Sequence, residues 1–348
     1  MRRIALDAMG SDNAPGPEVE GALAAVAEGD VEVVLVGDEA RLAQALAGRS
    51  HPRITLHHAS QVIAMDDAPS VAVKSKKDSS MRVCFDLAHR GEADAVVSAG
   101  NSGAMLACGL LVMKRLDGVE RPGLMTLAPT VTGAQCVALD VGANTEPRPS
   151  VLAQFAVLGA AYARIILGRE RPRVAVLSNG EEDSKGTDLT REANRMLRAP
   201  LPERAFDYAG YAEGRDFFTG EFDVIVTDGF TGNVGLKTFE GALRMVFDTL
   251  KAEVAKSPRA KLGALLMKPV FDALKLRLEP DESGGAPLLG VDGVVIVCHG
   301  RTNAKAMKNG ILTAARYVDL GLAPALAEAI ALHRRLWEAP AEGTAVAE

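Results

Sequence analysis

Polar, glycine-rich segments follow several short apolar runs of this sequence, and their residue types suit the binding of an anion. The segments are LDAMGSDNAPG (6–16), SAGNSGA (98–104), LDVGANTEP (139–147), LSNGEEDSKGTD (177–188), TDGFTGNVGLK (227–237) and CHGRTNAKA (298–306). In an open parallel sheet, ligands bind beyond the carboxyl ends of the strands. Any one segment could be an ordinary turn, because Asp, Asn, Ser and Gly are common there. Together they predict a ligand site at one edge of a sheet.

Two of these segments, SAGNSGA and GFTGNVG, are predicted to be polar turns that open directly onto apolar helices. A helix N-terminus presents free N–H groups and a partial positive charge, which favour a phosphate or an oxyanion. Lys185 and Lys237 each follow a predicted strand after a short segment rich in Gly and Asn, where an ammonium group can reach a bound anion. The alternative for each lysine is a solvated position on a helix face.

Several familiar catalytic and nucleotide-binding motifs are absent. No GxGxxG follows the first apolar run, residues 180–187 lack the second glycine of a phosphate loop, and no GxSxG elbow is present. Among the histidines, only His299 lies in a candidate segment, where a structural role is the alternative. The acids of these segments are scattered without the compact spacing of metal ligands. We therefore expect neither a metal nor a cofactor.

Short runs rich in β-branched residues alternate with helix-length amphipathic segments. The runs predicted to be strands are residues 3–7, 31–36, 53–58, 94–98, 136–140, 173–178, 223–227 and 292–297. This alternation is typical of βαβ units around a largely parallel sheet, and apolar character on both faces indicates strands covered by helices on each side. Residues 151–167 and 234–250 have the spacing of buried helices. We expect a single large α/β catalytic domain over residues 1–338.

Residues 245–280 interrupt the alternation and are predicted to form a helical hairpin, broken at Ser257 and Pro258. Within it, residues 256–277 contain six cations and one acid, which gives this stretch a net charge of +5 in a chain of net charge −6. Leucines lie beside these cations, and lysines at every seventh position fall near one helical stripe. The last ten residues, 339–348, are expected to be a flexible tail.

Composition narrows the possible classes of function. The chain has 348 residues, of which 48% are apolar and 34 are glycine, as is typical of a globular α/β protein. The negative net charge argues against nucleic acid as the main partner. The cysteines Cys84, Cys108, Cys136 and Cys298 form no CxxC pair and lie in apolar runs, so we expect reduced core residues in the cytoplasm. No secretory leader is recognised, and no segment is expected to cross a membrane.

The ordered segments LDAMGSDNAP, SAGNSGA, DVGAN, LSNGEEDSKGT, TDGFTGNVGLKTFEG and LLGVDGVVIVCHG resemble the bacterial phosphate acyltransferase family, the acyl-[acyl-carrier-protein]:phosphate transacylases of the PlsX type. The likeness spans about residues 3–335. Ser11 and Ser102 stand where the family more often has glycine and threonine. The non-glycine Ser11 puts in doubt only how closely the backbone of that turn approaches a ligand.

The resemblance implies an enzyme that converts a long-chain acyl carrier protein thioester and inorganic phosphate to acyl phosphate and free carrier protein, for phospholipid (phosphatidic acid) biosynthesis. It also implies a Rossmann-like α/β/α architecture, similar to phosphate acetyltransferases and to enzymes like isocitrate dehydrogenase. A homodimer, peripheral membrane association and a downstream glycerol-3-phosphate acyltransferase are further implications.

The resemblance also suggests site residues. Lys185 and Asn233 match the family's strongest catalytic candidates, so Lys185 is expected to orient phosphate and Asn233 to polarise the thioester oxygen. The expected substrate- and phosphate-binding residues are Asp7, Asn101, Ser102, Gly103, Asn144, Asn179, Gly232, Lys237 and His299. Asp140 and Asp228 are expected to orient these groups. Because phosphate itself can attack a thioester, no enzyme nucleophile is required.

Three interpretations of the basic hairpin stay open: it packs a dimer, it docks an acidic carrier protein, or it lies on a membrane surface. Its expected contact residues are Lys261, Leu265, Leu266, Lys268 and Lys275. Three alternatives to the implied activity also remain: a short-chain phosphate acyltransferase that uses acyl-CoA, a dehydrogenase of the isocitrate type, and a noncatalytic scaffold. The missing nucleotide fingerprint disfavours the dehydrogenase.

Overall fold

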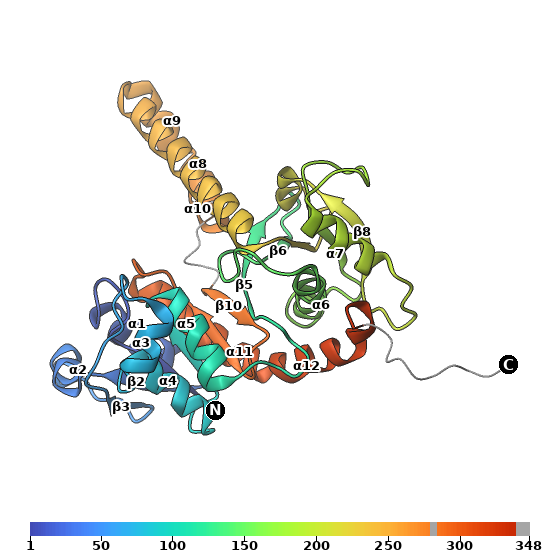
Figure 1. Cartoon of the computed structure of the whole chain (residues 1–348). Helices are drawn as coiled ribbons and strands as arrows, with labels where there is room; N and C mark the ends of the chain where they lie inside the picture. The colour runs from blue at the N-terminus through green and yellow to red at the C-terminus, as the bar shows by residue number, and fades with distance from the viewer. Residues whose placement is uncertain (279–283, 339–348) are drawn as a thin grey trace.

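An eleven-stranded sheet organises the computed structural model, which describes residues 1–278 and 284–338 (Figure 1). Its order is β3-β2-β1-β4-β11-β10-β5-β6-β9-β7-β8. The strands are β1 (Arg2–Asp7), β2 (Val31–Gly37), β3 (Ile54–His58), β4 (Ala95–Ser98), β5 (Gly123–Pro129), β6 (Gln135–Leu139), β7 (Arg173–Leu177), β8 (Asp207–Ala212), β9 (Val224–Val226), β10 (Ala286–Leu289) and β11 (Val294–Val297). All eight strands predicted from the sequence are present.

Two parallel regions of the sheet meet at an antiparallel centre. Strands β1, β2, β3, β4 and β11 pair in parallel, as do β6, β7, β8 and β9. Between them, β10 is antiparallel to both β11 and β5, and β5 is antiparallel to β6. The predicted α/β fold with a largely parallel sheet is thus confirmed. Strands β5, β8 and β10 were not predicted, because β5 begins with Gly and ends with Pro, β8 contains Gly210, and β10 has only four residues, one of them Pro.

Helices cover both faces of the sheet. They are α1 (Gly16–Glu28), α2 (Glu39–Leu46), α3 (Pro69–Ser75), α4 (Ser80–His89), α5 (Ser102–Cys108), α6 (Pro149–Ile166), α7 (Asp188–Arg198), α11 (Ala304–Asp319) and α12 (Leu322–His333). Along β1, Ile4 and Leu6 belong to one buried cluster, whereas Ala5 belongs to another on the opposite face. All four cysteines lie within the described residues, where they are buried and form no disulfide, as expected of core residues.

Helix α6 is the one described helix that is long and apolar enough to cross a membrane. Within this helix, 78% of the window that meets the criterion is buried inside the protein. It packs against β9, β6 and β7 and against helices α7 and α12. Its Gln154 side chain is buried and accepts a hydrogen bond from the backbone N–H of Glu120 at 2.8 Å. Helix α6 is therefore the central core helix of this half of the fold.

A helical arm projects from the body (Figure 1). We define the arm as the end of α8 (Gly229–Ala255) from residue 244 onward, with α9 (Pro258–Leu266) and α10 (Lys268–Leu278). The chain breaks between α8 and α9 at the predicted place, where the Ser257 hydroxyl caps α9 by accepting a hydrogen bond from Ala260 N. The predicted helical hairpin is confirmed in its described part. The end of its expected range, residues 279–280, and the expected tail, 339–348, lie outside the described residues, and the single catalytic domain over 1–338 stays a prediction.

Candidate active site

A cleft of about 2720 Å³ runs from the carboxyl ends of the strands along α8. Most of the predicted site residues line it: Asn101, Ser102, Gly103, Asn179, Asp228, Gly232, Asn233, Lys237 and His299. Asp7, Asp140, Asn144 and Lys185 do not belong to its lining. The structure therefore brings together segments that lie more than a hundred residues apart in the sequence.

The buried carboxylate of Asp7 fixes the loop between β4 and α5. It accepts a hydrogen bond from the Ser98 hydroxyl at 2.7 Å, and Ser98 Oγ in turn accepts one from Gly100 N at 3.0 Å. Burial raises the pKa of Asp7, while hydrogen bonds from Ser80, Ser98 and Met9 oppose the shift. Asp7 lies behind the cleft, so its position suits orienting the loop rather than touching a ligand.

Asp140 fixes a second loop. Its Oδ1 accepts hydrogen bonds from the backbone N–H groups of Leu124, Gly142 and Ala143 at 3.0–3.1 Å, and its Oδ2 accepts from Asn144 N at 2.7 Å and Asn144 Nδ2 at 2.9 Å. Burial raises the pKa of Asp140, and these hydrogen bonds oppose the shift. The side chain of Asn144 also donates to Pro122 O at 2.7 Å. Asp140 and Asn144 therefore form the support of the loop behind the cleft.

Helix α8 begins earlier than predicted. Asp228 caps it by accepting a hydrogen bond from Thr231 N at 2.8 Å, so residues 229–233, predicted as a polar turn, form its first turn. Gly229 N donates to Asn144 O at 2.6 Å, which joins the helix start to the loop of Asp140. The prediction of a turn was wrong because two glycines in five residues resemble a loop. Here glycine is required for close packing instead: a Cβ on Gly232 would overlap the carbonyl oxygen of Asp140.

Asn233 lies at the junction of α8 with the Asp140 loop. Its Nδ2 donates one hydrogen bond to Val141 O at 3.0 Å. A carboxamide nitrogen has two N–H groups, so a second donor is left at the edge of the cleft. The backbone contact fixes the orientation of the amide, which is the property an oxyanion donor needs.

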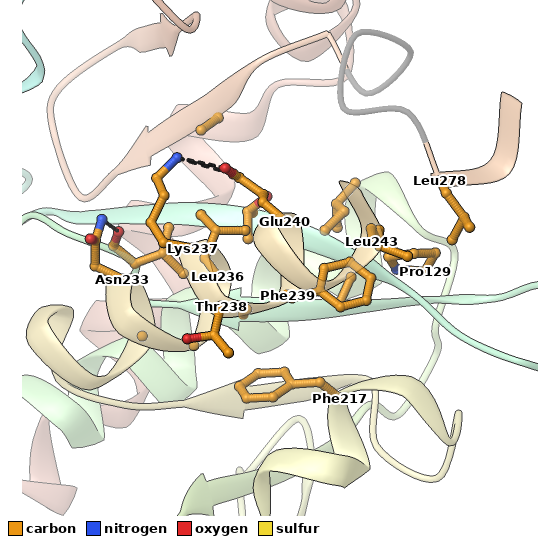
Figure 2. A pocket seen from close by; sticks show the side chains of 18 of the residues that line it. Pro129, Phe217, Asn233, Leu236, Lys237, Thr238, Phe239, Glu240, Leu243 and Leu278 are labelled. Carbon is orange, nitrogen blue, oxygen red and sulfur yellow. Dashed lines mark hydrogen bonds and ion pairs between the residues drawn. The ribbon is translucent and has the colours of Figure 1, made fainter. Parts of the chain in front are cut away.

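The two lysines singled out from the sequence lie in different surroundings. Lys237 lies on α8, one turn after Asn233, and its Nζ pairs with Glu240 at 2.9 Å (Figure 2). It is therefore a helix-face lysine beside the cleft, not a loop residue. Lys185 is exposed in the 178–187 loop, which is closed by a hydrogen bond from Gly186 N to Asn179 Oδ1 at 2.8 Å. Asn179, Gly186 and Thr187 line the cleft. Lys185 directly precedes Gly186 in the chain and therefore lies at the rim of the cleft.

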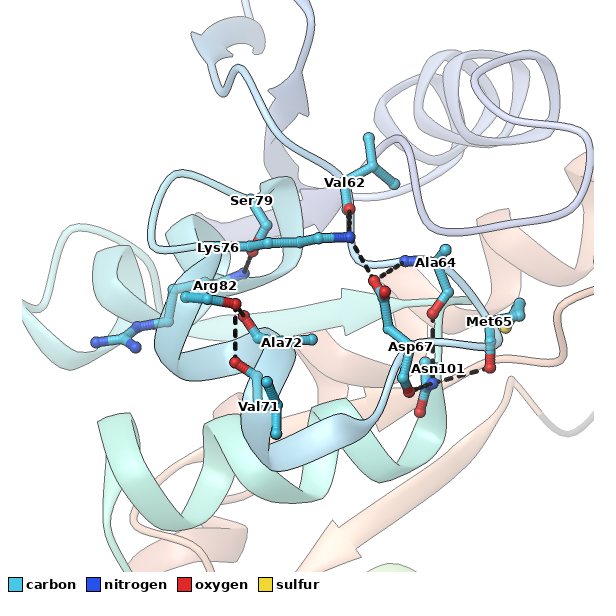
Figure 3. Close-up of polar contacts among 11 residues, drawn as sticks. Val62, Ala64, Met65, Asp67, Val71, Ala72, Lys76, Ser79, Arg82 and Asn101 are labelled. Carbon is cyan, nitrogen blue, oxygen red and sulfur yellow. Dashed lines mark hydrogen bonds and ion pairs between the residues drawn. The ribbon is translucent and has the colours of Figure 1, made fainter.

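The side chain of Asn101 is fully engaged in the structure. Its Oδ1 caps α5 by accepting from Ala104 N at 3.0 Å, and its Nδ2 donates to Met65 O at 3.0 Å and Asp67 O at 3.2 Å (Figure 3). The loop it holds is further tied by Asp67, whose carboxylate pairs with Lys76 Nζ at 2.5 Å. Asn101 thus joins α5 to the 64–67 loop, and the neighbouring Ser102 and Gly103 line the cleft.

His299 also lines the cleft. Its Nδ1 accepts a hydrogen bond from Arg301 N at 3.2 Å, so Nε2 is the ring nitrogen that can serve a ligand in the cleft. The loop of His299 is tied to the first predicted segment by a hydrogen bond from Asp12 N to Gly300 O at 2.9 Å. Two predicted segments therefore form one wall.

Glu18 was not singled out from the sequence, where it resembles an ordinary acid in the first turn of a helix. Its side chain is fully buried in α1, beneath the loop of Ser11. Burial raises the pKa of Glu18 to about 7, and the nearby Asp7 carboxylate adds to the shift. Ser11 does not adopt a positive φ, so this position needs no glycine.

The arm residues predicted as contacts differ in their surroundings. Leu265 and Leu266 are 66% and 76% exposed near the tip of the arm, whereas Lys268 pairs with Asp272 at 2.6 Å. Lys261 is exposed, and Lys275 lines the cleft. No cluster of three or more His, Cys, Asp or Glu side chains suited to a metal occurs within residues 1–278 and 284–338.

Known proteins provide an independent comparison. The family model described as "Fatty acid synthesis protein" matches residues 2–324. A phosphate acyltransferase from Geobacter sulfurreducens is 51% identical over 328 residues, covering 94% of this chain and 93% of the relative. A phosphate acyltransferase from Anaeromyxobacter dehalogenans is 48% identical over 346 residues, covering 98% and 94% of the two chains.

Solved structures show a similar fold at low sequence identity. A phosphotransacetylase from Streptococcus pyogenes matches with a TM-score of 0.58 and 19% identity, covering 91% of this chain and 94% of that one. A branched-chain phosphotransacylase from Enterococcus faecalis matches with a TM-score of 0.56 and 14% identity, covering 91% and 99%. These likenesses support the expected architecture.

Proposed function

The chain belongs to the fatty acid synthesis protein family, whose relatives above are phosphate acyltransferases, and we propose that it transfers the acyl group of a long-chain acyl carrier protein thioester to inorganic phosphate. The observation that best supports the proposed chemistry is the Asn233 amide. It is oriented by Val141 O and keeps one N–H donor at the edge of the cleft.

In the proposed reaction, an oxygen of hydrogen phosphate attacks the thioester carbonyl carbon. The new C–O bond forms a tetrahedral intermediate, whose collapse breaks the C–S bond and releases the carrier thiolate. The proton of the phosphate ends on that thiolate, which leaves acyl phosphate and free carrier thiol. This balance requires no redox partner, cofactor or enzyme nucleophile.

The protein contributes orientation and charge stabilisation to these steps. Holding phosphate beside the carbonyl can contribute about 7–11 kcal/mol in well-oriented systems. We assign that role to Lys185, at the rim, with Asn179 and the Ser102–Gly103 segment as further contacts. Asn233 donates to the developing oxyanion, while Asp7, Asp140 and Asp228 fix the loops and the helix start. Gly232, Lys237 and His299 form the surrounding wall.

We further propose that the enzyme takes its acyl group from acyl carrier protein, forms a homodimer and contacts the membrane peripherally. A glycerol-3-phosphate acyltransferase would consume the acyl phosphate. The exposed leucines and the cations of the arm support an acidic or amphipathic partner at its tip.

One assay tests the proposed function directly. Purified protein is incubated with phosphate and either palmitoyl carrier protein, acetyl-CoA or butyryl-CoA, and acyl phosphate is detected by mass. We expect palmitoyl phosphate together with stoichiometric free carrier thiol. Efficient turnover of the short CoA thioesters, with none of the carrier thioester, would instead identify the short-chain enzyme.

A further inference from the structure

An apolar stripe extends from the polar end of the cleft along α8. Leu236, Phe239, Leu243 and Phe247 are separated by three or four residues, so they share one face of the helix. All four are half-buried and line the cleft, whereas their neighbours Met245 and Val246 point to solvent and are 64% and 55% exposed. The stripe is therefore the face that α8 turns towards the body.

Aromatic and aliphatic side chains form the facing wall. Phe218 stacks on Phe239 with ring centroids 4.4 Å apart, and Phe217 and Pro129 line the same part of the cleft (Figure 2). Leu278, at the end of α10, lines it from the arm. The close-up shows Phe217, Pro129 and Leu278 around the same stretch of α8 that presents Asn233 and Lys237.

Arg277 keeps this groove assembled. Its Nη2 donates to Thr130 O at 2.5 Å and to Val131 O at 3.1 Å, which ties the end of α10 to the turn between β5 and β6. The arm is thereby held against the strand that supplies Pro129. The charged pair at the polar end, Lys237 and Glu240, is mutually neutralised. Further along α8, Arg244, Asp248 and Lys251 also border the cleft, but most of the surface that lines it is apolar.

The groove continues directly from the proposed reaction centre. Asn233 precedes Leu236 by three residues, and Phe247 follows Asn233 by fourteen positions, which is about 21 Å along the helix at about 1.5 Å per residue. The cleft is also larger than the roughly 300–1,000 Å³ usual for small-molecule sites, and far larger than phosphate requires. The space beyond Asn233 therefore suits a long apolar group attached to the reacting carbonyl.

We propose that this stripe binds the acyl chain of the thioester, with the carbonyl at Asn233 and the chain running along α8 towards Phe247. The proposal rests on the proposed function for the identity of the ligand, but the groove itself is tested separately below. It makes Phe239, Leu243 and Phe247 specificity-determining residues for chain length.

The test compares Leu243→Asp with Leu332→Asp, a matched change on helix α12 at a leucine that is 46% exposed and remote from the cleft. Values of kcat/KM are measured with butyryl, octanoyl, dodecanoyl and palmitoyl carrier protein. Each methylene in contact with the groove should raise kcat/KM about fourfold, which corresponds to about 0.8 kcal/mol. Leu243→Asp should lower the palmitoyl value at least tenfold and the butyryl value less than twofold, and Leu332→Asp should change neither.

A binding measurement separates the groove from the reaction. Fluorescence of cis-parinaric acid should increase on addition of the wild-type protein, and Leu243→Asp should weaken this binding at least tenfold. If no thioester gives acyl phosphate but this difference is seen, the groove stands and the proposed function fails. If acyl phosphate forms while the variant keeps the wild-type chain-length profile and binding, the proposed function stands and the groove is refuted. Light scattering provides a further check: conversion of a dimer to a monomer by Leu243→Asp would show that a second copy covers the stripe, and would overturn the proposal.

Discussion

The loops at the strand ends and the arm are built in opposite ways. Buried carboxylates fix the loops: Asp7 acts through Ser98, and Asp140 accepts five hydrogen bonds from its own loop and Leu124. The arm has no buried side chain in α9 or in α10, and Arg277 ties its end to the body. The loops thus have the fixed geometry that oriented donors need, while the arm offers surface for large partners. Changes in the loops should affect chemistry, and changes at the tip should affect association.

The largest effect is expected from Gly232→Val. The new side chain would overlap Asp140 O and separate the start of α8 from the loop that positions Asn233, so acyl phosphate formation should fall below detection. The matched control is Gly241→Ala in the same helix, where an added Cβ meets no atom within 4 Å. That variant should retain activity and gain about 0.5–1 kcal/mol of unfolding free energy. Normal turnover by Gly232→Val would contradict the described contact.

Asn233→Ala and Lys185→Ala test the chemistry while keeping the contact of Gly229 N with Asn144 O and the hydrogen bonds of Asp140. Loss of one oxyanion donor typically lowers kcat about 10²–10³-fold, so we expect a decrease of that size for Asn233→Ala. Lys185→Ala should lower acyl phosphate formation at least tenfold and should raise the KM for phosphate. Initial rates at several phosphate concentrations measure both effects, and thermal unfolding shows that the variants are folded. A folded variant with near-normal rates removes that residue from the mechanism.

Glu18 tests how the buried acids of the loop region affect stability. Its pKa rises from 4.5 in the unfolded chain to about 7 in the folded protein, so the folded state binds this proton more tightly. The associated stability is fully present below pH 4.5 and is lost as the pH rises to about 7. The loss amounts to about 3 kcal/mol at 1.36 kcal/mol per pKa unit.

Glu18→Gln should remove this pH dependence. The variant should be more stable than the wild type at pH 8 and should lose that advantage at pH 4.5. Urea unfolding across this range measures the difference, since urea itself does not titrate. Parallel stability curves for the two proteins would show that Glu18 ionises normally in the fold.

The smallest effect on stability is expected at the tip of the arm. Because Leu265 and Leu266 are exposed, the double change Leu265→Glu, Leu266→Glu should alter the unfolding free energy by less than about 0.5 kcal/mol. It should, however, reduce flotation with vesicles that contain anionic lipid. Unchanged flotation excludes the membrane interpretation, while a shift in mass by light scattering would favour the dimer. Pull-down with carrier protein tests the remaining interpretation.

Sequence patterns predicted the parallel parts of the fold well, because βαβ units repeat one local signal. The central antiparallel pair was missed, since the pairing of β5 with β10 joins residues more than 150 positions apart and has no local signature. For the candidate site, the segments were identified by composition, but composition does not distinguish a residue facing the cleft from one behind it. Asp7 and Asn179 both lie in polar, glycine-containing segments that follow a predicted strand. Only the tertiary structure shows that the first supports a loop from within and that the second lies on the cleft.

The start of α8 was also predicted incorrectly, because the local sequence does not show why glycine is needed there. Glycine usually indicates a turn, so GFTGN was assigned to one. In the structure, Gly229 and Gly232 lie in the helix because loop atoms approach them closely: a Cβ on Gly229 would lie 2.7 Å from Asn144 O. Such contacts depend on residues about ninety positions earlier, which no local pattern contains.

Helix α8 finally gives the molecule a mechanical connection between its two contrasting regions. It is one uninterrupted helix of 27 residues, about 40 Å long at about 1.5 Å per residue. No proline lies within it to act as a hinge. Its first turn presents Asn233 and its last turn lies in the arm, so a single continuous helix joins the amide at the edge of the cleft to the surface that the arm offers to partners.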